Sequence, residues 1–267
     1  MPVGRDEKTR PSVVCKKKRG VAYLLLNRPE VLNTINREML ERLSRFLEDI
    51  RKEDSVKAVI ISGSGEKAFS AGADISYLSQ ASPLEVRDLA RLAVSVTGQL
   101  ESLGKVSVAA INGYALGGGL ELAEACTLRI AAKSARLGHP EVRIGAVAGW
   151  GGTTRLPRLI GKGRAAELLL TGRMISADDA FAYGLVNRVV DHDLLMEGTR
   201  DLLNEVLSQS SLAVKMTWEA VHRGLDLPVD ESARLGADYF GLAAATQDFR
   251  AGTKAFLKKK KPVFRGK

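Results

Sequence analysis

The most informative stretch of this chain reads Asn112-Gly113-Tyr114-Ala115-Leu116-Gly117-Gly118-Gly119-Leu120-Glu121. Its three consecutive glycines predict the opening of a helix, with the carboxylate of Glu121 in the first turn. Glycines allow a ligand to approach the main chain closely, and the first N–H groups of a helix have no partners within it. Together with the helix dipole, such amides suit an oxygen that gains negative charge. A first-turn acid after a glycine turn also occurs for helix stability alone, so this stretch needs independent support.

A second carboxylate, Glu141, lies in the stretch Gly138-His139-Pro140-Glu141-Val142-Arg143-Ile144-Gly145. The apolar run Leu128–Ala132 before it predicts a strand that returns the chain toward the same end of the structure. Acid–base catalysis often needs two carboxyl groups whose surroundings keep their pKa values apart. Glu121 and Glu141 are therefore candidates for such a pair, whereas His139 in the same turn is interpreted as structural.

A third turn of small residues reads Lys67-Ala68-Phe69-Ser70-Ala71-Gly72-Ala73-Asp74-Ile75 and follows a predicted strand over Val56–Ser62. It too can present backbone N–H groups to a ligand. Two such turns could supply two donors to one oxygen.

These three segments, in this order and at this spacing, resemble the enoyl-CoA hydratase/isomerase, or crotonase, superfamily. Each motif is weak alone, but the ordered set is specific for the superfamily and less specific for the reaction. The resemblance covers nearly the whole chain from about Val13 onward. It extends through Leu26-Asn27-Arg28-Pro29, Leu32-Asn33, Gly151-Gly152-Thr153, Arg155-Leu156-Pro157, Leu170-Thr171-Gly172 and Gly184-Leu185-Val186.

The resemblance implies an α/β fold: a crotonase-like spiral of ββα units followed by a C-terminal helical trimerisation region. We divide the chain into a flexible arm (1–12), a spiral core (13–200) and a helical region (201–267). Hydrophobic periodicity predicts two strands within Val13–Leu26 around a lysine-rich turn, and further strands over Val106–Ile111 and Leu185–Val190. It predicts helices over Asn36–Lys52, Pro83–Leu103, Arg164–Leu170, Ser176–Tyr183, Leu194–Leu207, Leu212–Arg223 and Val229–Phe256.

Site residues follow from the resemblance, position by position. It implies that the backbone amides of Ala73 and Gly118 hold the thioester oxygen, that Glu121 activates water, and that Glu141 supplies a proton. For coenzyme A it implies contacts with Val31, Ala71, Asp74, Phe256 and Lys259, the last two across a subunit boundary. Lys259 is also one of four consecutive lysines, which are usually solvated.

Composition agrees with this interpretation. The net charge is +9, which favours anionic ligands, and the three phosphate groups of coenzyme A are an economical explanation. No RNA-recognition or zinc pattern accompanies the basic clusters, so an RNA-binding protein is the different-class alternative, suggested by charge alone. Cys15 and Cys126 lie far apart without metal-ligand spacing. We expect no metal, no prosthetic group, no membrane span and a cytoplasmic location.

The predicted function is hydration of a 2-enoyl-CoA thioester by a homotrimer or a dimer of trimers. The alternatives are enoyl-CoA isomerisation, for which one carboxylate can suffice, or another crotonase-type reaction such as thioester hydrolysis or decarboxylation. Ala148 replaces a proline common in hydratases, and Thr127 replaces a common aspartate. Trp150 between two glycines either shapes the acyl pocket or packs in the core.

Overall fold

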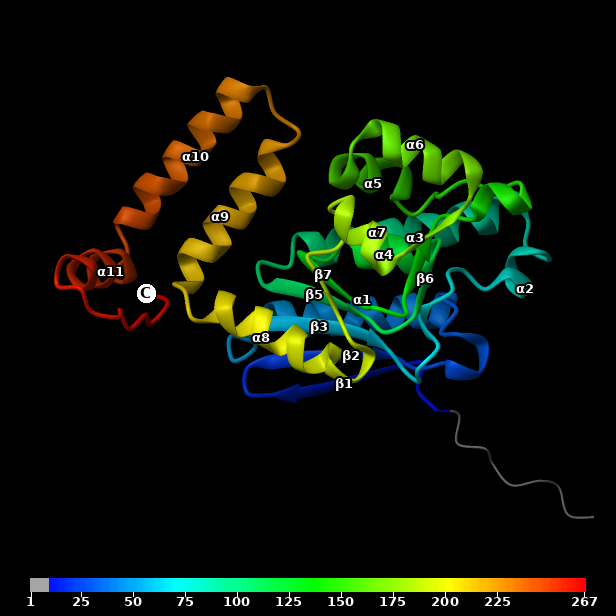
Figure 1. Ribbon diagram of the computed structural model, residues 1–267, viewed down its shortest axis with the longest axis horizontal. Coiled ribbons are helices and arrows are strands. Elements are labelled where there is room, and N and C mark those ends of the chain that lie inside the picture. Colours follow the sequence, from blue (N-terminus) through cyan, green and yellow to red (C-terminus); the bar gives the residue numbers. More distant parts are fainter. Residues whose placement is uncertain (1–9) are drawn as a thin grey trace, which may run out of the picture. The chain divides into compact units, whose positions relative to one another are not determined.

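The computed structural model describes residues 10–267, and the predicted arm over 1–12 lies mostly outside them. The chain divides into two compact units (Figure 1). The first contains residues up to Leu103 together with Ser107–Thr199, and the second contains Gly104–Val106 and Arg200–Lys267.

The larger sheet of the first unit has six strands in the order β1-β2-β3-β5-β7-β10. β1 and β2 form an antiparallel hairpin, whereas β2 with β3, β5 with β7, and β7 with β10 pair in parallel. The prediction that the lysines form the turn is wrong, because Lys16–Lys18 lie in β1. The turn consists of two residues, Arg19 and Gly20, both with positive φ. The predicted strand over Leu185–Val190 is shorter than expected. The bounds are β1 Val13–Lys18, β2 Val21–Leu26, β3 Ala58–Gly63, β5 Val106–Ile111, β7 Leu128–Ala132 and β10 Arg188–Val190.

A second sheet of four very short strands was not predicted. It comprises β4 (Ala68–Ser70), β6 (Tyr114–Leu116), β8 (Arg136–Gly138) and β9 (Met174–Ser176), in that order. β4, β6 and β8 run parallel, and β9 is antiparallel to β8. Each of the three parallel strands leads into one of the turns singled out from the sequence. Their carboxyl ends meet at one edge of the sheet, which brings these turns together.

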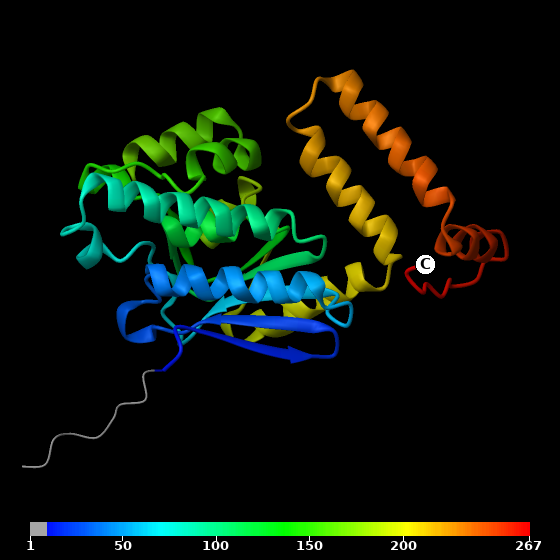
Figure 2. The same cartoon turned by 180° about the vertical axis from the view of Figure 1, so that it is seen from behind.

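Two long helices pack against each other beside the six-stranded sheet (Figure 2). α1 (Arg37–Lys52) begins after Asn36, whose side chain accepts the Met39 N–H, and α3 (Pro83–Glu101) begins with a capping box at Ser82. Both helices bury their apolar faces in the core. The other helices are α2 (Ile75–Leu78), α4 (Gly118–Glu124), α5 (Gly152–Ile160), α6 (Lys162–Thr171), α7 (Ala177–Ala182) and α8 (Leu195–Leu207), with 3-10 turns η1 (Pro29–Val31), η2 (Glu141–Ile144) and η3 (His192–Leu194).

The second unit contains α9 (Ser211–Gly224), α10 (Val229–Ala244) and α11 (Gln247–Leu257). The prediction of one helix over Val229–Phe256 is wrong, because the chain breaks at Thr246, whose hydroxyl caps α11 by accepting the Phe249 N–H at 3.0 Å. Asp248 in α11 is buried and accepts the amides of Arg265 and Gly266, which fastens the C-terminal tail. Large apolar side chains of these helices are exposed, including Phe240 and Phe256.

The described residues, 10–267, include no helix that is both long and apolar enough to cross a membrane. Cys15 is half-buried in β1, and Cys126 is fully buried just after α4. The Cys126 thiol donates weakly to the Leu122 carbonyl at 3.7 Å.

Candidate active site

The turns after β4, β6 and β8 approach one another so closely that glycine is required at the contacts. A Cβ atom on Gly72 would lie 2.8 Å from the Leu116 carbonyl oxygen and 3.4 Å from the Gly118 nitrogen. A Cβ atom on Gly117 would lie 2.7 Å from Oε1 of Glu141. Both glycines also have positive φ, of 98° and 49°, which disfavours other residues. The structure therefore brings the segments of Ala73, Gly118 and Glu141 into one site.

Two backbone amides in this site are free to bind a ligand. Ile35 pairs with the Ala73 segment by donating to the Gly72 carbonyl at 2.7 Å and accepting from the Asp74 amide at 3.1 Å. In such a parallel bridge, the amide of the intervening residue, Ala73, points to the other side. Gly118 is the first residue of α4, so its amide has no partner in the helix. Within residues 10–267, neither amide donates a hydrogen bond.

Glu121 is held by the main chain. Its Oε1 accepts the amides of Trp150 and Gly152, each at 2.7 Å, and the residue is only 1% exposed. Burial raises the pKa of Glu121 to about 7, although the Gly152 amide and His139 act in the opposite direction. This carboxyl group can therefore both accept and give up a proton near neutral pH.

The loop that holds Glu121 is itself fixed by Arg155 in α5. The guanidinium of Arg155 donates to the Trp150 carbonyl at 3.0 Å and forms a two-pronged ion pair with Glu101 at 2.7 Å. The indole ring of Trp150 covers Gly118, because a Cβ atom there would lie 2.4 Å from its Cζ3. Trp150 is thus buried in the core and also borders the Gly118 amide.

Glu141 lies on η2 and is held much less firmly. Its side chain is 15% exposed and makes no hydrogen bond to the described residues. Oε1 lies 3.8 Å from Nδ1 of His139, whose Nε2 donates to Glu124 at 2.8 Å. Burial opposes the charge of His139, but attraction to Glu124 and Glu141 outweighs it and raises its pKa to about 10.

Sequence reasoning missed the contact of His139 with Glu124. Glu124 follows Glu121 by three residues on α4, so both acids lie on one face of the helix. A buried acid such as Glu124 needs a partner, and this requirement was the signal that the sequence offered. The partner, fifteen residues away, could not be identified from spacing.

The predicted coenzyme A contacts fall into two groups. In the first unit, Val31 is exposed on η1, the Ala71 amide donates to Leu32, and Asp74 forms an ion pair with Arg28 at 3.2 Å. In the second unit, Phe256 is 82% exposed on α11, and Lys259 follows that helix with positive φ.

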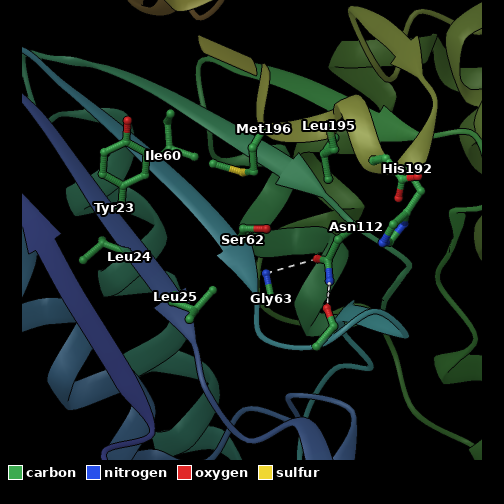
Figure 3. Close-up of a pocket in the computed structure, with 12 residues that line it drawn as sticks. Tyr23, Leu24, Leu25, Ile60, Ser62, Gly63, Asn112, His192, Leu195 and Met196 are labelled. Atoms are coloured by element: carbon green, nitrogen blue, oxygen red, sulfur yellow. Dashed lines mark hydrogen bonds between the residues drawn. The ribbon is translucent and has the colours of Figure 1, made fainter. Parts of the chain in front are cut away.

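A cavity of about 320 Å³ lies elsewhere in the first unit (Figure 3). Asn112 spans one side of it, accepting the Gly63 amide at 3.1 Å and donating to the Gly65 carbonyl at 2.8 Å. None of the predicted site residues lines this cavity. Its walls come from β2, β3, η3 and the start of α8, and include Tyr23, Ile60, Ser62, His192 and Met196. Among residues 10–267 there is no cluster of side chains that could hold a metal ion.

Two free amides beside two carboxyl groups suit an enzyme that stabilises a developing oxyanion while it moves protons at neighbouring atoms. The chain belongs to the enoyl-CoA hydratase/isomerase family, whose model matches residues 16–267.

Individual relatives agree over nearly their whole length. Crotonyl-CoA hydratase of Syntrophomonas wolfei is 41% identical, over 95% of this chain and 97% of that protein. Short-chain-enoyl-CoA hydratase of Clostridium acetobutylicum is 40% identical, over 94% of this chain and 96% of that protein. The crystal structure of enoyl-CoA hydratase from Bacillus anthracis has a TM-score of 0.92 at 37% identity, and the match covers 96% of this chain and all of that one. The predicted α/β, crotonase-type fold is confirmed.

Proposed function

We propose that the chain is a 2-enoyl-CoA hydratase, which adds water across the 2,3 double bond of an enoyl-CoA thioester. The observation that carries this proposal is the convergence of Glu121 and Glu141 on the turns with the Ala73 and Gly118 amides. The hydratases to which the chain is similar support the same reaction.

In this mechanism the thioester oxygen accepts hydrogen bonds from Ala73 and Gly118. These amides stabilise the negative charge that reaches this oxygen as the double bond is attacked. Glu121 takes a proton from water as the water oxygen bonds to C3, and Glu141 gives its proton to C2. The two carboxyl groups therefore hold one proton between them, on Glu141 before the reaction and on Glu121 after it. Dehydration uses the same groups with their protonation states exchanged.

We further propose that the substrate is a coenzyme A thioester and that the enzyme holds no prosthetic group. Val31, Ala71 and Asp74 would contact the cofactor portion of the substrate, and Phe256 with Lys259 would complete a neighbouring subunit's site. The exposed apolar side chains of α10 and α11 suit burial in a homotrimer or a dimer of trimers. A cytoplasmic location belongs to the same proposal.

The direct test is an assay with crotonyl-CoA and a panel of longer and cyclic enoyl thioesters, following the loss of enoyl absorbance. We expect hydration of at least one member and salt-sensitive binding of acyl-CoA. Tight binding of arbitrary RNA with no affinity for coenzyme A would instead favour a nucleic-acid-binding function.

Isomerisation of an enoyl-CoA is the second candidate, because no described residue holds the Glu141 side chain by a hydrogen bond and one carboxyl group can suffice for that reaction. The variant Glu141→Gln separates the two. A hydratase should lose about 10²- to 10⁴-fold in turnover. Near-normal turnover would remove the two-carboxylate mechanism and favour the isomerase.

A further inference from the structure

A cluster of buried polar atoms includes one acid of the proposed catalytic pair, Glu141. Among residues 10–267, five buried side-chain polar atoms have no hydrogen-bond partner. Three of them are Nδ1 of His139, Oε2 of Glu124 and Oε2 of Glu141. Proteins satisfy nearly all buried polar groups, so such a concentration at one place indicates a function.

His139 lies between Glu124 and Glu141. Its Nε2 is committed to Glu124 at 2.8 Å, and the side chains of both residues are fully buried. The other ring nitrogen, Nδ1, therefore faces Glu141, at 3.8 Å from Oε1. This distance is too long for a hydrogen bond but short enough for strong attraction between opposite charges.

The imidazole ring of His139 is favoured in its charged form, as the partner of Glu124 in an ion pair. A fully buried carboxylate at Glu124 would be very unfavourable without a counter-charge, and an imidazolium at His139 provides one. Both ring nitrogens of an imidazolium are donors, so the second N–H is directed toward Glu141. The raised pKa of His139, about 10, agrees with this charged form.

We propose that His139, held by Glu124, is a positioning residue for Glu141. Its imidazolium keeps the Glu141 carboxyl group beside Gly117. This inference rests on the proposed hydratase function of Glu121 and Glu141.

Two arginines lie near the cluster. Arg129 on β7 donates to the carbonyls of Leu185, Cys126 and Glu124, and Arg155 on α5 is paired with Glu101. Within residues 10–267, His139 is the cation within 4 Å of Glu141. The remaining charged groups on the elements around it are Glu121 on α4, Arg136 on β8, Arg143 on η2, Arg158 on α5, and Lys162, Arg164 and Glu167 on α6.

The proposal makes a prediction about pH. Catalysis needs one proton shared by Glu121 and Glu141, so kcat/KM for hydration should fall at low pH, when both are protonated, and at high pH, when neither is. The His139 charge lowers the pKa of Glu121, which burial raises to about 7. Removing that charge should raise the pKa of Glu121 further and move the pH profile to higher pH.

The experiment compares His139→Gln with the wild type by measuring kcat/KM for crotonyl-CoA across pH. We expect the profile of the variant to move to higher pH, because the pKa of Glu121 rises when the positive charge is lost. His222→Gln is the matched control, because that ring stacks on Trp218 in the second unit, and its profile should match the wild type. Limbs that stay in place, with only reduced stability, would show a merely structural His139. A wild type inactive on every enoyl thioester would instead contradict the proposed function.

Nuclear magnetic resonance of the imidazole rings tests the charge of His139 without relying on activity. The chain has three histidines, so the three ring signals can be assigned by single substitutions. In the folded wild type, the ring of His139 should stay protonated above pH 9, and Glu124→Gln should lower the pH at which it loses its proton. Loss of the proton below pH 7 in the wild type, or no change in the variant, would overturn the proposal.

Discussion

The two carboxyl groups of the site are held in opposite ways. Glu121 is buried and fixed by two main-chain amides at 2.7 Å, in a loop that Arg155 holds in turn. The side chain of Glu141 makes no hydrogen bond to the other described residues, 10–267, and faces the buried imidazole of His139 at 3.8 Å. Main-chain geometry therefore determines the position of one acid, whereas a side-chain ion pair governs the other. Three substitutions, giving four predictions, test this difference.

The largest expected effect is that of Glu121→Gln on activity. Its carbonyl oxygen can still accept both amides, so the loop should keep its structure while the base is lost. Hydration should slow by about 10²- to 10⁴-fold. Steady-state assays with crotonyl-CoA measure this, with the exposed acid variant Glu167→Gln as control. Wild-type turnover in Glu121→Gln would show that the firmly held acid is not the base.

Gly118→Ala should be nearly as damaging. The new methyl group would lie 2.4 Å from Trp150, so the indole ring or the start of α4 must move, and the Gly118 amide with it. Loss of one oxyanion donor costs about 10²- to 10³-fold in kcat. Gly163→Ala is the control, because a Cβ atom there meets nothing within 4 Å. Equal activities of the two variants would argue against an oxyanion role for Gly118.

Glu121→Gln should also stabilise the protein at high pH. The folded-state pKa of Glu121 is raised to about 7 from 4.5, so the folded protein binds more protons in this range and loses stability as pH rises. Relative to the wild type, the variant should gain about 2 to 3 kcal/mol in free energy of unfolding between pH 5 and pH 8. Urea unfolding at matched protein concentration measures the gain. A constant difference would mean that burial does not strain this carboxyl group.

The smallest effect is expected for Arg155→Lys, which keeps the charge but loses the two-pronged pairing with Glu101 and the bond to the Trp150 carbonyl. The loop around Glu121 should loosen, lowering kcat by about threefold to tenfold, the scale of one net hydrogen bond. The imidazole signal of His139 should not move. A shifted His139 signal would show that the two acids are not held independently.

The three turns of the candidate site could be singled out from the sequence because their signals are local. The helix Gly118–Glu124 and the position of Glu121 in its first turn follow from consecutive glycines. Strands of three residues such as β4, β6 and β8 carry almost no periodicity, so the sheet that aligns these turns was not foreseen. α5 was also missed, because Gly151, Gly152 and Pro157 suggest a break rather than a helix. The pairing of His139 with Glu124 depends on tertiary contact alone.

The buried thiol of Cys126, just after α4, can report how often the end of this helix opens. Burial raises the pKa of this thiol to about 12, so almost no reactive thiolate exists while the thiol stays buried. Half-buried Cys15 should react first with an alkylating reagent, and Cys126 only when the end of α4 opens. The slow phase of labelling then reports how often this helix opens. A ligand that binds the protein only while the end of α4 is folded should slow this phase. The factor is one plus the ligand concentration divided by its Kd.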